Sequence, residues 1–205
     1  YEITCESDSC GVYYVDSQYV IYYDNGVEYI YDYQNGKNKQ ILNRLNGVKP
    51  VYKDKELVGF ILYLLQGQKY FDLNNNKIIN NMYYEDIIGC TEYCEVNDDD
   101  TIVVKNDGKY GLLNSKDGGT VFGLIYEDLL CQGNYCYAKL DGSYVIMNTN
   151  GNKLVKDSYN DVVYLNKKGY YIGLLSNEYK LYNNNGNVIF NLGSKDNIKE
   201  LNEYV

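Results

Sequence analysis

Six cysteines carry the clearest chemistry in this sequence, because they occur as three local pairs. Thiols either oxidise to disulfides or bind a metal ion as thiolates. A structural zinc site needs four ligands brought together, whereas the pairs are about 40 to 80 residues apart. We therefore predict local disulfides, each replacing a tight turn, and no metal site, with a shared thiolate site as the alternative. The predicted pairs are Cys5/Cys10, Cys90/Cys94 and Cys131/Cys136.

The cysteines also indicate a compartment. Disulfides form and persist in oxidising surroundings, so we expect a secreted or cell-surface protein. Small disulfide loops stabilise a fold by on the order of 2 kcal/mol each. In the last repeat described below, residues 166–169 (Asn-Lys-Lys-Gly) take the place of a cysteine pair. An ordinary turn at that place favours a purely structural role for the pairs.

Carboxylates are the other candidates for chemistry, since the sequence contains no His. The usual general base is therefore missing. Two adjacent acidic pairs, Glu85-Asp86 and Glu127-Asp128, recur at one phase of the repeat. Neighbouring residues of a strand point to opposite faces, so we interpret these pairs as structural markers of the repeat. No catalytic residue, cofactor or enzymatic activity is predicted.

Oxygen-rich segments offer a possible calcium site. The acidic run at 98–100 and the Asn-rich segments 148–152 and 183–186 contain suitable ligands. However, Asn and Gly are also the residues that hairpin corners require, and the twelve-residue calcium loop with its terminal Glu is missing. Turn chemistry is the favoured interpretation of all three segments.

Tyrosines form the candidate binding surface. Tyr29, Tyr31 and Tyr33 alternate along one strand, and so do Tyr19 and Tyr23. Such an aromatic strip could stack on sugar rings or pack against a protein partner. The alternative is cross-strand pairing inside the sheets. We favour packing and keep the strip as a weak binding candidate.

All these residues lie within a sequence pattern that repeats along the chain. The phrase at 107–114 (Asp-Gly-Lys-Tyr-Gly-Leu-Leu-Asn) has related phrases that begin at Tyr19, Tyr70, Tyr144 and Tyr179. Intervals of about 34 to 51 residues indicate stacked or radially arranged supersecondary units. We predict a single repeat domain over 1–193 and a C-terminal tail over 194–205, which forms a short helix or adds a strand. The predicted units are 1–40, 41–82, 83–125, 126–158 and 159–193.

Each unit is expected to contain four short strands. In the first unit we predict strands over 1–4, 11–15, 19–23 and 27–33, with Asn25-Gly26 as the hairpin turn. Five such units predict an all-β, β-propeller-like fold, because radial repetition leaves only short sheet edges. An open β-solenoid of stacked hairpins is the alternative.

The amino-acid composition and net charge exclude some classes of binding partner. Tyr accounts for 27 of 205 residues and Trp is missing, so much of the core must carry hydroxyl groups that need partners. A net charge of -9 opposes binding to nucleic acid. The longest apolar stretch, 57–65, is interrupted by Gly59 and is too short to cross a bilayer, so no membrane insertion is expected. The first residue, Tyr1, fits either a mature product or a trimmed chain.

Two phrases together point to a family. Tyr-Glu-Asp followed by two apolar residues occurs at 84–88 and 126–130, and Gly-Lys-Tyr-Gly-Leu-Leu-Asn occurs at 108–114. This combination resembles the bacterial WG (tryptophan-glycine) β-repeat family over most of the chain, and best over 84–193. Tyr110-Gly111 keeps the aromatic-glycine pair, although Tyr replaces Trp. The resemblance implies a secreted or surface-linked β-repeat protein with no shared catalytic residue.

These inferences lead to three functional hypotheses. The first is a secreted or cell-surface, non-catalytic binding module whose ligand is a protein or a glycan. The alternative is a structural subunit that self-associates into an extracellular assembly. The second alternative is a carboxylate-based glycosidase, which would need Asp or Glu side chains from different units about 5 to 10 Å apart.

Overall fold

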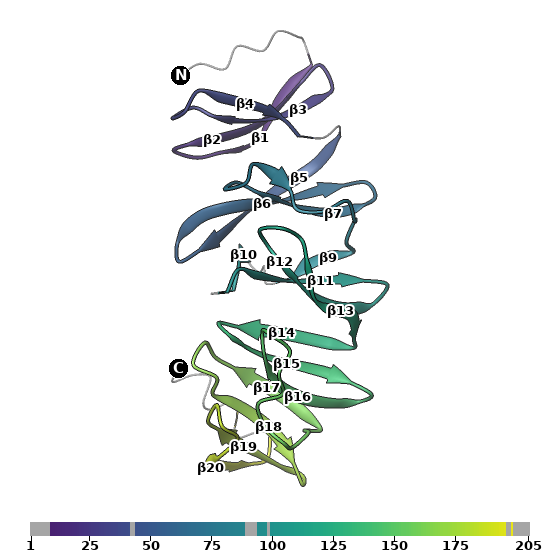
Figure 1. Cartoon of the computed structure of the whole chain (residues 1–205), viewed down its shortest axis with the longest axis vertical. Helices are drawn as coiled ribbons and strands as arrows, with labels where there is room; N and C mark the ends of the chain where they lie inside the picture. Colours follow the sequence, from purple (N-terminus) through teal and green to yellow (C-terminus); the bar gives the residue numbers. More distant parts are fainter. Residues whose placement is uncertain (1–8, 42–43, 89–93, 98, 196–197, 199–205) are drawn as a thin grey trace. The chain divides into compact units, whose positions relative to one another are not determined.

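The computed structural model describes residues 9–41, 44–88, 94–97, 99–195 and 198. The chain divides after Tyr84 into two compact units, residues 1–84 and 85–205. In the described ranges every regular element longer than one residue is a β-strand, and the strands form antiparallel sheets (Figure 1). The all-β fold predicted from the sequence is confirmed.

The first unit contains two sheets in which strands follow one another in chain order. The predicted strand over 1–4 lies outside the described residues, and the fourth strand of the first sheet is β4 instead. The first sheet consists of β1 (Cys10–Val15), β2 (Tyr19–Asp24), β3 (Val27–Asp32) and β4 (Lys37–Gln40). The second sheet orders β5 (Leu45–Lys53), β6 (Glu56–Leu64), β7 (Gly67–Asp72) and β8 (Lys77–Ile78).

The second unit contains three sheets of the same kind. The third sheet consists of β9 (Asp86–Ile88), β11 (Thr101–Asn106), β12 (Lys109–Asn114) and β13 (Thr120–Tyr126). The fourth contains β14 (Asp128–Gln132), β15 (Tyr135–Leu140) and β16 (Ser143–Asn148). The fifth contains β17 (Asp161–Leu165), β18 (Tyr171–Leu175), β19 (Glu178–Tyr182) and β20 (Val188–Gly193). A two-residue strand, β10 (Cys94–Glu95), lies between β9 and β11 in the sequence.

The fourth sheet corrects the prediction of four strands in every unit. Its outer position is occupied by two isolated bridges, Met147 with Lys153 and Tyr144 with Tyr159. Between the bridges, Val155 is buried in the same hydrophobic cluster as Tyr159 and residues of the fifth sheet. The two bridges are isolated, so the described residues of this segment form no continuous fourth strand.

Tight turns connect the strands as the sequence predicts. In Asn25-Gly26 both φ values are positive, 51° and 75°. Positive φ at both central residues defines the type I′ turn, whose twist matches that of a hairpin. The turns Asp107-Gly108 and Asp141-Gly142 have the same signature. The Asn-Gly hairpin prediction is confirmed, and the Asp-Gly phrase of the repeat has the same physical basis.

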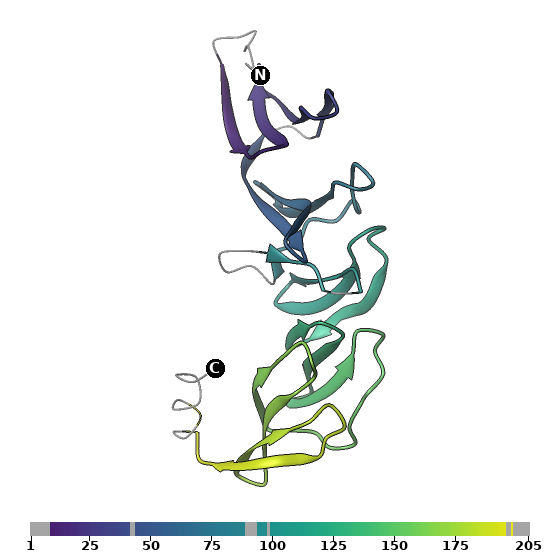
Figure 2. The same cartoon turned by 90° about the vertical axis from the view of Figure 1, so that its left-hand side faces the viewer.

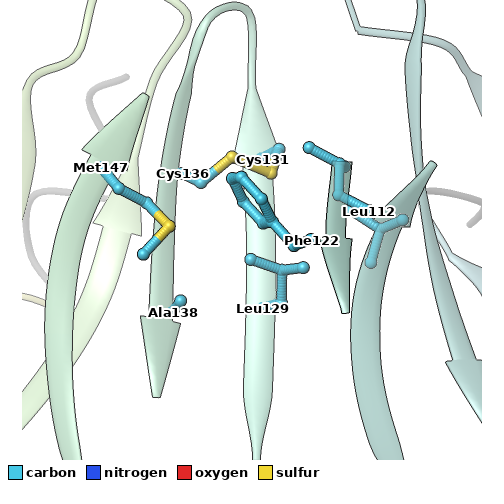
Figure 3. Close-up of a cluster of buried hydrophobic side chains, with 8 residues drawn as sticks. Leu112, Phe122, Leu129, Cys131, Cys136, Ala138 and Met147 are labelled. Atoms are coloured by element: carbon cyan, nitrogen blue, oxygen red, sulfur yellow. A yellow bond between two sulfur atoms is a disulfide. The ribbon is translucent and has the colours of Figure 1, made fainter. Parts of the chain in front are cut away.

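Hydrophobic cores form between successive sheets of each unit. In the second unit, Phe122 of β13 and Leu112 of β12 pack against Leu129 and the Cys131–Cys136 bridge of the fourth sheet (Figure 3). A second cluster joins the fourth sheet to the fifth. In the first unit an equivalent cluster joins the first sheet to the second. Each sheet therefore contributes one face to the core it shares with the next sheet of its unit.

The boundaries of the predicted repeat units can be compared with the sheets. Apart from β10 and the last residue of β13, Tyr126, the strands of each sheet come from one of the five units predicted from the sequence. The single 1–193 domain, the 194–205 tail and the choice between ring and open solenoid stay predictions. Within the described ranges, no helix has both the length and the apolar character needed to span a bilayer.

Candidate functional site

The Cys131–Cys136 pair forms a disulfide. The two residues face each other across β14 and β15, with their Cα atoms 4.1 Å apart. The sequence predicts that the bridge replaces a tight turn, and this prediction is wrong. It lies one residue pair above a two-residue turn, because Gln132 pairs with Tyr135 and Gly133 has a φ of 57°. Both cysteine side chains are buried in the core cluster, which makes this bridge structural.

The other predicted pairs are described only in part. Cys10 is disulfide-bonded, and its predicted partner Cys5 lies outside the described residues. Cys90 also lies outside them, and for Cys94 only the backbone is described. These two pairings stay predictions. In the fifth sheet the corresponding 166–169 segment is an ordinary turn, in which the Gly169 amide donates to the Asn166 carbonyl at 2.9 Å.

The five candidate tyrosines do not form one strip. The side chains of Tyr19 and Tyr23 share the face of the first sheet on which Ile21 pairs with Ile30 in the core. Tyr29 lies on the opposite face, where it pairs with Tyr22. The period of two along each strand was interpreted correctly. Register between β2 and β3, which a single strand does not reveal, places the two tyrosine sets on different faces.

Tyr29, Tyr31 and Tyr33 belong to the outer face of the first sheet, opposite the face of the Ile21–Ile30 core. The rings of Tyr22 and Tyr29 stack with centroids 5.2 Å apart, and those of Tyr31 and Tyr33 are tilted at 6.4 Å. The Tyr33 hydroxyl donates to the Asp16 carbonyl oxygen. The Tyr22–Tyr29 contact is a cross-strand pair, and the rings are half-buried.

The recurrent Glu-Asp pairs have structural roles. Glu85 Oε2 accepts a hydrogen bond from the Gly108 amide at 3.1 Å, and Glu127 Oε1 accepts one from the Gly142 amide at 3.3 Å. The glutamate thus caps the Asp-Gly turn of its own sheet in both repeats. Asp128, the next residue after Glu127, accepts from a tyrosine hydroxyl. The interpretation of these pairs as markers of the repeat is supported by these bonds.

The Asn-rich segments act as turns. Asn148 Oδ1 accepts hydrogen bonds from the amides of Asn150 and Asn152, at 3.1 and 2.9 Å. Asn183 makes the equivalent pair of contacts at 3.0 Å each. A side-chain oxygen that caps its own turn is not free to bind calcium. Among the described residues, no group of three or more His, Cys, Asp or Glu side chains could hold a metal ion.

A recess of about 300 Å³ lies in the second unit, beside the β14–β15 hairpin. Asp99 of the acidic run and Asn148 and Asn150 of the Asn-rich segment, both considered as calcium ligands from the sequence, line this recess. Asp99 Oδ1 accepts from the Thr101 hydroxyl at 2.8 Å. The Tyr135 hydroxyl accepts from Asn184 Nδ2 at 3.2 Å. The lining residues are Asp99, Asn134, Tyr135, Asn148, Thr149, Asn150 and Leu154.

Polar groups in this recess remain available for a ligand. The side chains of Asn134 and Asn150 make no hydrogen bond to the described part of the protein. Gly169, with φ at 79°, packs closely on the Tyr135 ring, since a Cβ there would lie 2.6 Å from Cε1. Tyr135 is therefore held in place from one side. The sequence indicates turns around residue 134 and at 148–150. It does not reveal that these two turns lie side by side in the recess.

A smaller recess of about 170 Å³ lies in the first unit. It includes one predicted tyrosine, Tyr19, together with Asp32 and the lysines at 37 and 39. Asp32 already accepts hydrogen bonds from the backbone and side-chain amides of Asn35. The Tyr19 ring contacts Phe60 edge-on at 6.3 Å. This recess is smaller, and its carboxylate Asp32 is already held by Asn35, so the larger recess is the better candidate site.

Fold and site together describe an all-β protein of repeated antiparallel sheets with a polar, aromatic recess. The chain matches no known protein-family model. No curated protein sequence matches it either.

Solved structures show a distant likeness in fold. Hsv2 of Kluyveromyces lactis is 9% identical with a TM-score of 0.46, over 90% of this chain and 64% of that one. A form of the K. lactis protein with loop 6CD replaced by a Gly-Ser linker is 11% identical with a TM-score of 0.48, over 89% and 66%. BBS1N, in a complex with ARL6DN, is 13% identical with a TM-score of 0.42, over 88% and 68%. The chain thus spans 64% to 66% of the two Hsv2 chains.

Proposed function

We propose that this chain is a non-catalytic binding module, secreted or exposed at the cell surface, and that it holds a carbohydrate in the recess beside the β14–β15 hairpin. The observation that carries the proposal is the lining itself. Among the described residues of the lining, one aromatic ring, Tyr135, lies beside amide and hydroxyl side chains and a single carboxylate. Sugar hydroxyls are recognised by such donors and acceptors, while an aromatic ring offers an apolar surface for a sugar face.

The charge of the recess favours a neutral ligand. Among the described residues of its lining, Asp99 is the one charged side chain, and it belongs to a chain of net charge -9. Anionic ligands would be repelled, which disfavours phosphate groups. A glycosidase would need two carboxyl groups flanking the bond to be cleaved, and the described residues of the lining provide one. Binding without cleavage is therefore the function that this chemistry supports best.

The proposed secreted or cell-surface location follows from the disulfide-bonded cysteines. Cys131 and Cys136 are joined in a buried bridge, and Cys10 is also disulfide-bonded. Such bonds are typical of secreted and surface proteins. The resemblance of residues 84–193 to WG repeats supports the same location and a passive role.

A glycan array followed by calorimetric titration of the best sugar tests the proposal. Tyr135→Ala should weaken binding by about tenfold or more, because the stacking surface is lost. Tyr135→Phe keeps the ring and should bind within a few fold of the wild type. Tyr29→Ala, on the outer face of the first sheet, is the control and should bind normally. Binding that survives Tyr135→Ala but is lost in Tyr29→Ala would move the site to the first sheet and contradict the proposal.

A further inference from the structure

The last strand of the fifth sheet contains three successive exposed apolar residues. Val188, Ile189 and Phe190 of β20 are all exposed, Phe190 to 62%. Within the second unit, Figure 2 shows β20 at the end opposite the third sheet. Phe190 lies opposite Leu181 and Val188 opposite Tyr182, so these two side chains belong to different faces of the sheet. Tyr182 packs in the cluster shared with the fourth sheet, so Phe190 marks the other face, where a large exposed apolar residue on an edge strand indicates an interaction site.

Phe190 has an internal counterpart that shows what such a residue packs against. It lies opposite Leu181, and Phe122 of the third sheet lies opposite Leu112. Each leucine comes two residues after the repeat tyrosine, Tyr179 or Tyr110. Phe122 is only 5% exposed, because the fourth sheet covers it (Figure 3).

The same arrangement recurs in the first unit. Ile30 of β3 lies opposite Ile21, which comes two residues after Tyr19. Ile30 is buried in a cluster with Phe60 and Leu62 of the second sheet. In both cases the residue at the Phe190 position is therefore covered by the next sheet. On the fifth sheet Ile198 packs with Ile172 and Leu192, but Phe190 remains uncovered.

The first sheet exposes the face that corresponds to the face of the fourth sheet packed against the third sheet. Val15 lies opposite Val20, as Ala138 lies opposite Val145 in the fourth sheet. Ala138 is fully buried against the third sheet, whereas Val15 is 66% exposed. Val12, which occupies the place that Cys136 has in the fourth sheet, is 60% exposed.

We propose that the Phe190 face of the fifth sheet binds the Val12/Val15 face of the first sheet of a second copy of this chain. The contact would reproduce between molecules the packing of the third sheet on the fourth. The two faces are different, so the association is head-to-tail and can continue into rings or filaments. This inference goes beyond the proposed carbohydrate binding and does not depend on it.

Sedimentation velocity of the 205-residue chain over a wide range of concentrations tests the proposal. The average mass of the wild type should rise with concentration. Phe190→Asp and Val15→Asp should each weaken self-association by roughly tenfold or more, because either change places a charge in the apolar contact. Ile125→Asp, which alters an exposed residue of β13, is the matched control and should associate like the wild type.

Mixing the two variants identifies the head-to-tail geometry. Phe190→Asp retains an intact first sheet and Val15→Asp an intact fifth sheet, so an equimolar mixture should form heterodimers that grow no further. A wild type that stays monomeric at every concentration overturns the proposal. Self-association of Val15→Asp alone, at wild-type strength, also overturns it, since the contact would then join two fifth sheets.

Controls separate misfolding from lost contact. Both substituted residues are exposed, so circular dichroism and thermal unfolding should match those of the wild type. If Phe190→Asp is less stable, Phe190→Ser provides the same test with a smaller change. Neither residue lines the carbohydrate recess, so sugar titrations of these variants should be unchanged. Failure of one proposal is thereby distinguished from failure of the other.

Discussion

The Tyr179 hydroxyl donates a hydrogen bond of 2.7 Å to Asp161 Oδ2, a contact that ties the third strand of the fifth sheet to its first. Tyr144 makes the same contact with Asp128 in the fourth sheet, at 3.0 Å. Both tyrosines open the repeat phrase, and both aspartates follow the position of the Glu cap. In the fourth and fifth sheets, the tyrosine that opens the repeat phrase therefore connects the third strand to the first through a hydrogen bond from its hydroxyl to a carboxylate.

Removing that hydroxyl should weaken the fold. Tyr179→Phe should lower the free energy of unfolding by about 1.5 to 3 kcal/mol, since a hydrogen bond to a charged group is lost. Asp161 would keep its ion pair with Lys195, at 3.6 Å, which limits the loss. Urea denaturation measures the change. Tyr170→Phe, at a partly exposed position, is the control and should unfold like the wild type; equal effects of the two variants would contradict the assigned role.

Alkaline pH should destabilise the protein. Burial raises the pKa of the Tyr182 hydroxyl to about 12. Burial, followed by the hydrogen bond to Asp161, raises the pKa of Tyr179 to about 12 as well. An unfolded chain releases these protons near the ordinary pKa of 10.0, so the folded state binds more protons above it. Stability should be fully present below pH of about 10 and fall as the pH rises toward about 12.

Two measurements check the alkaline effect. The free energy of unfolding in urea should decrease over this pH range, and Tyr179→Phe should reduce the slope. Tyrosinate absorbance should show part of the tyrosines ionising at higher pH in the folded protein than in urea. A free energy that stays level across the range would refute the prediction.

Loss of the Cys131–Cys136 bridge should cost stability without abolishing the sheet. The double variant Cys131→Ala/Cys136→Ala should unfold with a free energy lower by about 2 kcal/mol, because the bridge closes a small loop. Thermal unfolding of the variant, compared with the wild type with and without reductant, measures the difference. In the native state the buried sulfurs should resist reduction. Rapid labelling of both thiols under mild reductant would contradict the buried position of the bridge.

Two glycines should respond differently to substitution by alanine. Gly142 has a φ of 77° with open space around it, so Gly142→Ala should cost only the backbone strain of about 1 kcal/mol. Gly169 has a similar φ, but its added Cβ would collide with the Tyr135 ring. Gly169→Ala should therefore destabilise the protein more and weaken sugar binding, because Tyr135 must shift. Equal melting temperatures for the two variants would refute this difference.

Local chemistry was predictable from the order of the residues. Asn25-Gly26 and Asp107-Gly108 specify type I′ turns because their φ values must be positive, and nothing outside the turn is needed to favour them. The alternation of apolar residues predicted strands for the same reason. The spacing of Cys131 and Cys136 indicated a local bridge, although the register that places it above the turn came from the paired strands.

The sequence by itself established an all-β chain of repeated hairpin sheets, since turn residues, strand periodicity and the repeat interval are properties of neighbouring residues. The tertiary structure separated Tyr19 and Tyr23 from Tyr29, because faces are assigned by register between strands. It also joined Asp99 to Tyr135 in one recess and left Phe190 uncovered. These outcomes depend on which sheet packs beside which, and the free energy of that packing comes from side chains distant in the sequence.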